Sequence, residues 1–234
     1  MVNSKYFLLG LKSLAGGRSP AVALATSFIA LGAIFKHSGF NLEQSVASSL
    51  FTYALPGQLV MTESYLIGAS LINIFISVWL VNFRFYPMTV ALMPALQHKN
   101  QPRWKYYISC HFLAVSSWLI MKEGYKKIDK RFRLDYWIGI GSATVSVSVI
   151  GTFIGFSFSE YLNKDMMIGL AILNPVYFLC MMVGASKTIP VTLSVLLGTI
   201  LGPIIYLFSP EWSILLAGVI GGTIAYLVGE HSVS

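Results

Sequence analysis

The residues with the most evident chemistry lie inside an apolar stretch of the chain. Residues 71–94 are long enough to cross a bilayer, but Asn82-Phe83-Arg84 interrupts them. An arginine at the centre of a membrane helix costs roughly 2.5–3.5 kcal/mol, so it normally faces protein or water. Pro87 weakens the helix just past this charge because it has no amide donor. We therefore expect a broken helix whose polar groups are covered by protein or by a water-filled cavity.

Arg84 at that depth can bind a carboxylate. A guanidinium holds a carboxylate with two charge-assisted hydrogen bonds, and Asn82 offers both a donor and an acceptor. A zwitterionic amino acid would supply such a carboxylate. Glu63 and Glu160 are the acids that the sequence places near hydrocarbon, and Glu63 can equally reach an interface. If either acid neutralises Arg84, the Asn82 and Arg84 pair is a structural brace instead.

Two further interruptions combine proline with polar or small residues. Pro56-Gly57-Gln58 lies in the middle of residues 42–71, and Asn174-Pro175 interrupts residues 167–183. Comparable breaks in two halves of a chain point to a transporter built from inverted repeats, with its substrate where half-helix ends meet. The alternative is that both prolines only kink packed helices. The substrate site that we predict consists of Pro56, Gly57, Gln58, Asn82, Arg84 and Asn174.

The composition indicates what kind of fold positions these residues. Of the 234 residues, 56% are hydrophobic and 11% are charged, whereas a soluble domain carries about 25% charged residues. We therefore predict an all-α polytopic integral membrane protein with seven or eight transmembrane helices, some of them broken. The formal charge of +7 does not indicate nucleic acid, because the basic residues cluster in loops beside apolar spans.

We expect a single transmembrane domain over residues 1–234. Residues 1–18 form an interfacial amphipathic segment, 19–121 the first half, 122–135 a basic loop and 136–234 the second half. The six basic residues of that loop predict a cytoplasmic location. With eight full spans, three other basic residues would lie on the opposite side. They would join the loop if one broken segment were re-entrant, and both topologies stay open: these residues are Lys99, Arg103 and Lys105.

Local signals predict where helices begin and how they pack. Asn41 followed by Gln44 is typical of a capping box. The fifth expected span, residues 136–158, contains Gly151 and Gly155 in a small-xxx-small pattern that favours close helix packing. Cys110 and Cys180 lie in separate apolar segments, so we expect free thiols.

Other polar side chains in the spans are candidates for coupling to an ion gradient or for pairing helices. They are Glu63, His111, Ser116 and Ser117, and the serine hydroxyls can also bond back to the preceding turn. No nucleophile elbow, metal pair, phosphate loop or carboxylate dyad appears in the sequence. We therefore expect no enzyme activity, no metal site and no cofactor.

Two motifs resemble those of a known family. LVNFRFYPMTVALMPAL, residues 80–96, resembles the LVNxRH…SLAPxL signature of the AzlC family, the large subunits of branched-chain amino acid exporters. FTYALPGQLVM resembles its FAGSAQF segment, and a less specific likeness extends over residues 20–184. Gln58, Asn82 and Arg84 match polar positions of the family. Phe85 stands where the family usually has histidine, and Ser116-Ser117 where an Asp-Glu pair is common.

The resemblance implies a function. It implies a secondary transporter in the cytoplasmic (inner) membrane of a bacterium, which exports branched-chain or other apolar amino acids, driven by an ion gradient. It also implies an AzlD-like small membrane subunit as partner. If the Asp-Glu pair carries protons or binds an amino group in relatives, this protein uses another acid or another substrate. The competing function is a non-transporting scaffold or accessory subunit whose polar residues only pin helices.

Overall fold

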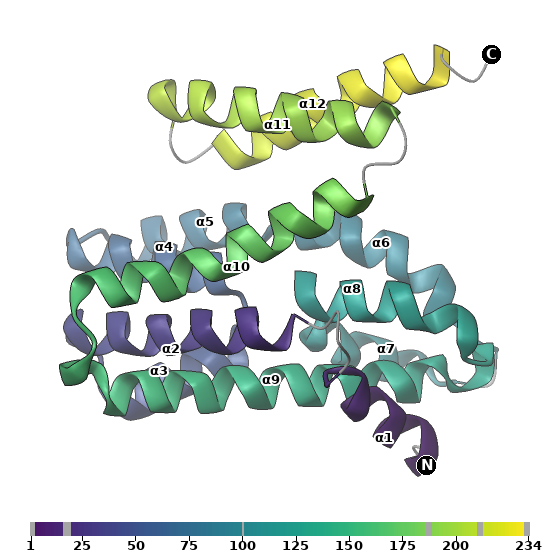
Figure 1. The fold of residues 1–234 in the computed structure, drawn as a ribbon, viewed down its shortest axis with the longest axis horizontal. Helices are drawn as coiled ribbons and strands as arrows, with labels where there is room; N and C mark the ends of the chain where they lie inside the picture. The colour runs from purple at the N-terminus through teal and green to yellow at the C-terminus, as the bar shows by residue number, and fades with distance from the viewer. Residues whose placement is uncertain (1–2, 16–19, 100, 186–188, 210–212, 232–234) are drawn as a thin grey trace.

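The computed structural model describes residues 3–15, 20–99, 101–185, 189–209 and 213–231. In these ranges every regular element is helical (Figure 1). The helices are α1 (Ser4–Ser13), α2 (Ala21–His37), α3 (Leu42–Phe51), α4 (Leu55–Leu66), α5 (Leu71–Asn82), α6 (Phe85–Leu96), α7 (Arg103–Ser109), α8 (Val115–Gly124), α9 (Arg133–Ser157), α10 (Lys164–Ala185), α11 (Ile189–Phe208) and α12 (Ser213–His231), with 3-10 turns at Cys110–Phe112, Tyr125–Lys127, Lys130–Phe132 and Ser159–Tyr161.

The centre of the fold is the pair α2 and α9, which lie side by side (Figure 1). Their contact depends on glycine at each crossing point. A methyl group on Gly32 would overlap the backbone of Thr152, and a methyl group on Gly155 would overlap the backbone of Ile29. The absence of side chains lets the two backbones approach closely. This confirms the small-residue packing face predicted for residues 136–158.

The N-terminal segment is the helix α1, which crosses α9. Gly10 packs against Gly139, and the backbone N–H of Asn3 donates to Oδ2 of Asp135 over 3.2 Å. Lys5 and Lys12 are exposed, as an amphipathic helix requires. The segment that the sequence analysis assigned to residues 1–18 thus contains a helix from Ser4 to Ser13.

A short break at residues 52–54 separates α3 from α4, hydrogen bonds from Gln58 to Ser48 and Ser49 link them, and we call these two helices the first hairpin. The predicted capping box starts α3, since the backbone N–H of Gln44 donates to Oδ1 of Asn41 over 2.8 Å and Oε1 of Gln44 accepts from the backbone N–H of Asn41 over 3.0 Å. The chain breaks before Pro56, as predicted, and Pro56 lies in the first turn of α4. Tyr53 in the break has a φ of 44°, a left-handed conformation that is uncommon for a large side chain.

A break in the chain also separates α7 from α8, and we call these two helices the second hairpin. Leu113 and Ala114 are extended between a 3-10 turn and α8. The physical reason is Ser117, whose Oγ accepts from the backbone N–H of Ala114 over 2.9 Å and donates to the carbonyl of Phe112 over 2.6 Å. These bonds replace those of a continuous helix.

The two hairpins come from opposite ends of the molecule. In Figure 1 the labels of α3 and α4 lie in its left half and those of α7 and α8 in its right half. The starts of α4 and α8 meet at one cavity, which residues 54–56 and 114–116 both line. The helices α5 and α6 connect the two hairpins and bend by 45° at Phe83-Arg84. The predicted break in residues 71–94 is therefore confirmed.

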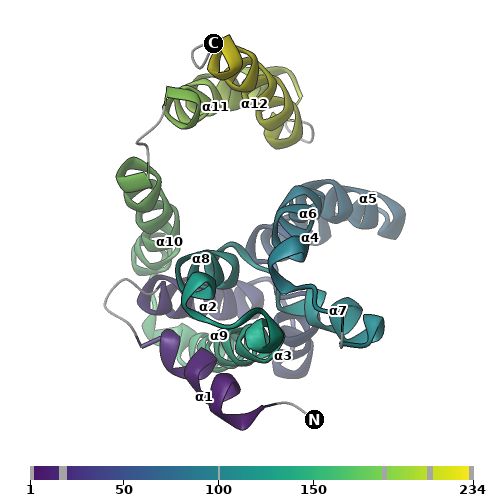
Figure 2. The same cartoon turned by 90° about the vertical axis from the view of Figure 1, so that its right-hand side faces the viewer.

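The C-terminal region differs from the prediction. α10 runs as one helix from Lys164 to Ala185 beside α2, so the expected break at Leu173-Asn174-Pro175 is wrong. An interior proline removes one amide donor, which a 22-residue helix can tolerate with a local adjustment. α11 and α12 pack on each other and make few contacts with the other helices (Figure 2).

Length and hydropathy identify few complete spans in the described residues. Lys130–Ser157 and Val191–Phe208 are each long and apolar enough to cross a membrane, and α5 with α6 would be a third. The four hairpin helices are 12 residues or shorter, whereas a full span needs about 20. The described part of the chain therefore does not confirm seven or eight spans.

Candidate functional site

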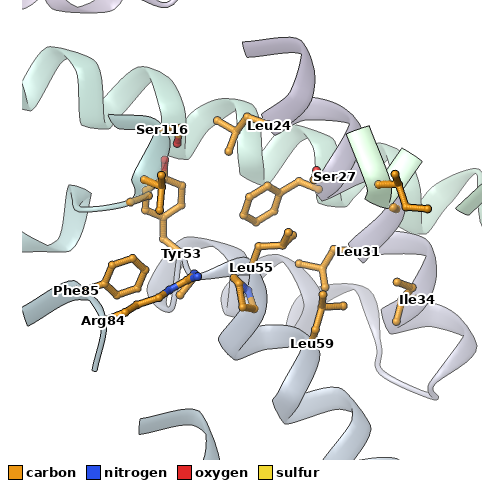
Figure 3. A pocket seen from close by; sticks show the side chains of 17 residues that line it. Leu24, Ser27, Leu31, Ile34, Tyr53, Leu55, Leu59, Arg84, Phe85 and Ser116 are labelled. Atoms are coloured by element: carbon orange, nitrogen blue, oxygen red, sulfur yellow. The ribbon is translucent and has the colours of Figure 1, made fainter. Parts of the chain in front are cut away.

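A cavity of about 500 Å³ lies between α2 and the starts of α4 and α8 (Figure 3). Its volume is in the range of small-molecule sites. Its walls are largely apolar, with Leu24, Phe28 and Leu31 from α2 and Leu59 from α4. We call it the Arg84 cavity, because Arg84 is the charged residue among the described residues that line it.

Arg84 is half-buried at the break between α5 and α6 and has no acidic partner among the described residues. Its side chain extends toward Leu55 at the start of α4 (Figure 3), and its Nε is buried without a hydrogen-bond partner. Glu63 is exposed, and Glu160 forms an ion pair with Lys36 over 3.3 Å. The structural brace that Glu63 or Glu160 would have formed with Arg84 is therefore not present.

Two helix N-termini also line the Arg84 cavity. The N-cap residues of α4 and α8 are Ala54 and Ala114, and neither makes a side-chain capping bond to the first turn. The first amides of a helix have no partner within it, and the helix dipole places partial positive charge there. Together with Arg84, these two ends make an apolar cavity that favours one negative group.

Tyr53 is a cavity residue that the sequence analysis did not identify. Only 2% of its surface is exposed, and its ring points toward Ser116 (Figure 3). Its hydroxyl lies near those of Ser116 and Thr144 but makes no hydrogen bond of good geometry. A buried hydroxyl without a partner and a left-handed backbone are both features of binding sites. No local pattern signals them, because φ at Tyr53 depends on how the hairpin packs.

The sequence predicted that Gln58 contacts the substrate. In the structure Gln58 lies behind the wall of the Arg84 cavity. It is fully buried, and its Nε2 donates to Oγ of Ser48 over 3.0 Å and to Oγ of Ser49 over 3.3 Å. The hydroxyls of Ser49 and Thr152 are 2.6 Å apart. This chain of bonds joins α4 to α3 and α9. Gln58 is thus a positioning residue for the start of α4.

This network predicts a difference between two neighbouring serines. Ser49→Ala should lower the free energy of unfolding by about 1–3 kcal/mol, because it leaves buried polar groups of Gln58 and Thr152 without a partner. Ser48→Ala should have a smaller effect, since Ser48 is only half-buried. Thermal unfolding of both variants in detergent measures this difference. Equal losses would show that the bond to Thr152 is unimportant.

Asn82 faces a different cavity from Arg84, although the two are close in sequence. It lines a second cavity of about 290 Å³ together with His111. We call this space the Asn82 cavity. Oδ1 of Asn82 is buried without a hydrogen-bond partner. Gly57 packs directly against it, because a Cβ there would lie 2.6 Å from Nδ2 of Asn82 and the amide would have to move.

The remaining predicted residues are placed as follows. Pro56 and Ser116 line the Arg84 cavity, whereas Ser117 shapes the second hairpin. His111 is exposed, with its ring centroid 6.5 Å from that of Tyr53. The backbone of Asn174 belongs to α10, but its side chain lies outside the described residues.

Comparison with known proteins adds one finding. A family model described as AzlC protein matches residues 20–162, and no curated protein and no solved structure matches the chain. The matched region is more than half of the chain and contains both hairpins, the bent pair α5 and α6, and α9. Family members are associated with branched-chain amino acid transport and with membranes. The chain therefore belongs to the AzlC family.

Proposed function

We propose that this protein is a multi-pass transporter in the bacterial cytoplasmic membrane that exports amino acids with apolar side chains, branched-chain ones among them. The observation that carries the proposal is an apolar cavity with one cation that no described acid neutralises, at the meeting point of two helix N-termini. A non-transporting scaffold would have no need for an unpaired arginine there, since burying an unpaired charge is costly.

Each part of an apolar amino acid has a matching group in the Arg84 cavity. The carboxylate accepts hydrogen bonds from Arg84 and from the first amides of α4 and α8. The side chain packs against Leu24, Phe28 and Leu31. The amino group donates to the hydroxyl oxygens of Tyr53 and Ser116, because serines stand here in place of the Asp-Glu pair common in the family.

The hairpins support a topology with two re-entrant segments. Lys99 and Arg103 line one cavity together with Lys130 of the basic loop, so both basic loops lie on one side, which we assign to the cytoplasm. The second hairpin then enters from that side and the first from the other. Opposed re-entrant hairpins suit an inverted repeat. The counterpart of the break before Pro56 is the break at Leu113-Ala114.

Two parts of the proposal come from the family resemblance. One is an AzlD-like small membrane subunit that assembles with this chain. The other is coupling of export to an ion gradient, for which His111 is a candidate because it lines the Asn82 cavity beside the substrate site.

The proposal predicts selective stabilisation by apolar amino acids. Leucine, valine and methionine should raise the melting temperature of the purified protein, because a ligand at 100 times its Kd adds about 2.7 kcal/mol to the stability of the state that binds it. Aspartate and lysine should not, since the wall that would face their charged side chains is formed by Leu24, Phe28 and Leu31. Preloaded leucine should leave proteoliposomes that contain this protein and the small subunit faster than it leaves liposomes without protein. Equal release rates would contradict the proposal.

A further inference from the structure

Three cavities follow one another through the protein. The Arg84 cavity and the Asn82 cavity share two lining residues, Ala54 and Phe85. The Asn82 cavity shares Thr89 and Cys110 with a third cavity of about 920 Å³. These shared residues place the three cavities next to one another, with a shared wall between each cavity and the next.

The third cavity, which we call the basic mouth, is lined by Lys99, Arg103 and Lys130. No carboxylate is among the described residues that line it. Cations at the mouth of a cleft raise the local concentration of anionic groups. The mouth therefore favours solutes that carry a carboxylate.

The ring of Phe85 is the bulky part of the wall between the Arg84 and Asn82 cavities, because Ala54 contributes only a methyl group. Phe85 is the first residue of α6, directly after the break at which α5 and α6 bend by 45°. Its ring centroid is 5.1 Å from Cζ of Arg84. A change in the bend or in the side-chain rotamer would move the ring out of the wall.

We propose that Phe85 is the gate between the substrate cavity and the basic mouth. With the ring in the wall, the Arg84 cavity is sealed from the mouth. With the ring displaced, the Arg84 cavity, the Asn82 cavity and the mouth form one passage for the carboxylate-bearing solute. This inference rests on the proposed function, because a gate requires a solute that passes it.

A thiol in the substrate cavity tests the gate without any amino acid. Leu59→Cys is introduced into a chain with Cys110→Ser and Cys180→Ser, and the membrane-impermeant anionic reagent MTSES is applied to intact cells and to inverted membrane vesicles. A chain that keeps Cys110, with Cys180→Ser alone, identifies the preparation in which the mouth is open to the reagent, because Cys110 lines the mouth. The cavity thiol should react only in the other preparation. With Phe85→Ala added, it should react in both.

Matched variants exclude indirect effects. Phe83→Ala removes the same atoms two residues away, and Phe83 lines none of the three cavities, so labelling should stay one-sided. Phe85→Leu opens the wall partially and serves if Phe85→Ala does not fold. The gate is refuted if the cavity thiol already reacts from the mouth side with Phe85 present, or if folded Phe85 variants stay one-sided. If Phe85→Ala makes labelling two-sided but no amino acid stabilises the protein, the proposed function is contradicted, whereas Phe85 is still shown to separate the cavities.

Discussion

Replacing Arg84 with glutamine should abolish amino acid binding while the protein stays folded. Arg84 makes no ion pair with any residue that the structure describes, and its Nε is buried without a hydrogen-bond partner. Replacing Arg84 therefore breaks no ion pair among the described residues, and the contact it removes is the one with the ring of Phe85, whose centroid is 5.1 Å from Cζ. A bound carboxylate loses its charged partner, which costs about 2–5 kcal/mol, or roughly thirty-fold to several thousand-fold in affinity. Ligand-induced shifts in melting temperature measure the loss.

Two controls show whether Arg84 reads the carboxylate. Leucinamide, which lacks the carboxylate, should fail to stabilise the wild-type protein, whereas leucine should succeed. Arg84→Lys should retain weak binding, because lysine keeps the charge but lacks the two-pronged geometry of the guanidinium. Undiminished binding of leucinamide would show that Arg84 does not bind the carboxylate. A large fall in the melting temperature of ligand-free Arg84→Gln would favour the scaffold function.

The second large effect is expected at Gly155, where α9 touches α2. Gly155→Ala would drive a methyl group into the backbone of Ile29. Backbone atoms cannot move aside as the end of a flexible side chain can, so the helices must separate. Overpacking in a well-packed core costs typically 1–3 kcal/mol and occasionally more. Because α2 also forms the apolar wall of the Arg84 cavity, the variant should lose ligand binding as well.

A graded series of glycine substitutions provides the control. Gly151→Ala should cost less than Gly155→Ala, because its Cβ would lie 3.1 Å from the carbonyl oxygen of Ala25 and from Cβ of Phe28. Gly198→Ala in α11 meets no atom within 4 Å and should stabilise by about 0.4–1 kcal/mol. Thermal unfolding in detergent ranks the three variants by melting temperature. If Gly155→Ala melts like Gly198→Ala, the close contact of α2 with α9 is not needed for stability.

The sequence identified the features that depend on neighbouring residues alone. The capping box at Asn41 needs only a side chain three residues away from a backbone amide. The break at Arg84 follows from a charge and a proline inside an apolar run, and the packing face at Gly155 from the spacing of small residues. The AzlC motif around Arg84 is also local, and the family match confirms it. These features were enough to predict a helical protein and to identify Arg84 as a candidate site residue.

Sequence reasoning failed where proline was taken as the sole sign of a broken helix. The chain passes Pro175 without a break in helix, because one missing amide bond is a small part of a long helix. It breaks at Leu113-Ala114, where neither proline nor glycine stands, because Ser117 satisfies the backbone groups that the break exposes. The sequence had treated Ser117 as a coupling or pairing residue.

Only the tertiary structure decided which polar residues face the same space. Asn82 and Arg84 are two residues apart, yet the bend between α5 and α6 sends them into different cavities. The side chain of Gln58 points inward to Ser49, and that of Tyr53 lines the Arg84 cavity. These outcomes depend on how two hairpins, distant in sequence, pack against α2 and α9. Residue types and spacing thus determined which groups carry charge and where helices weaken, whereas long-range packing decided which groups share a cavity and whether the charge of Arg84 is neutralised.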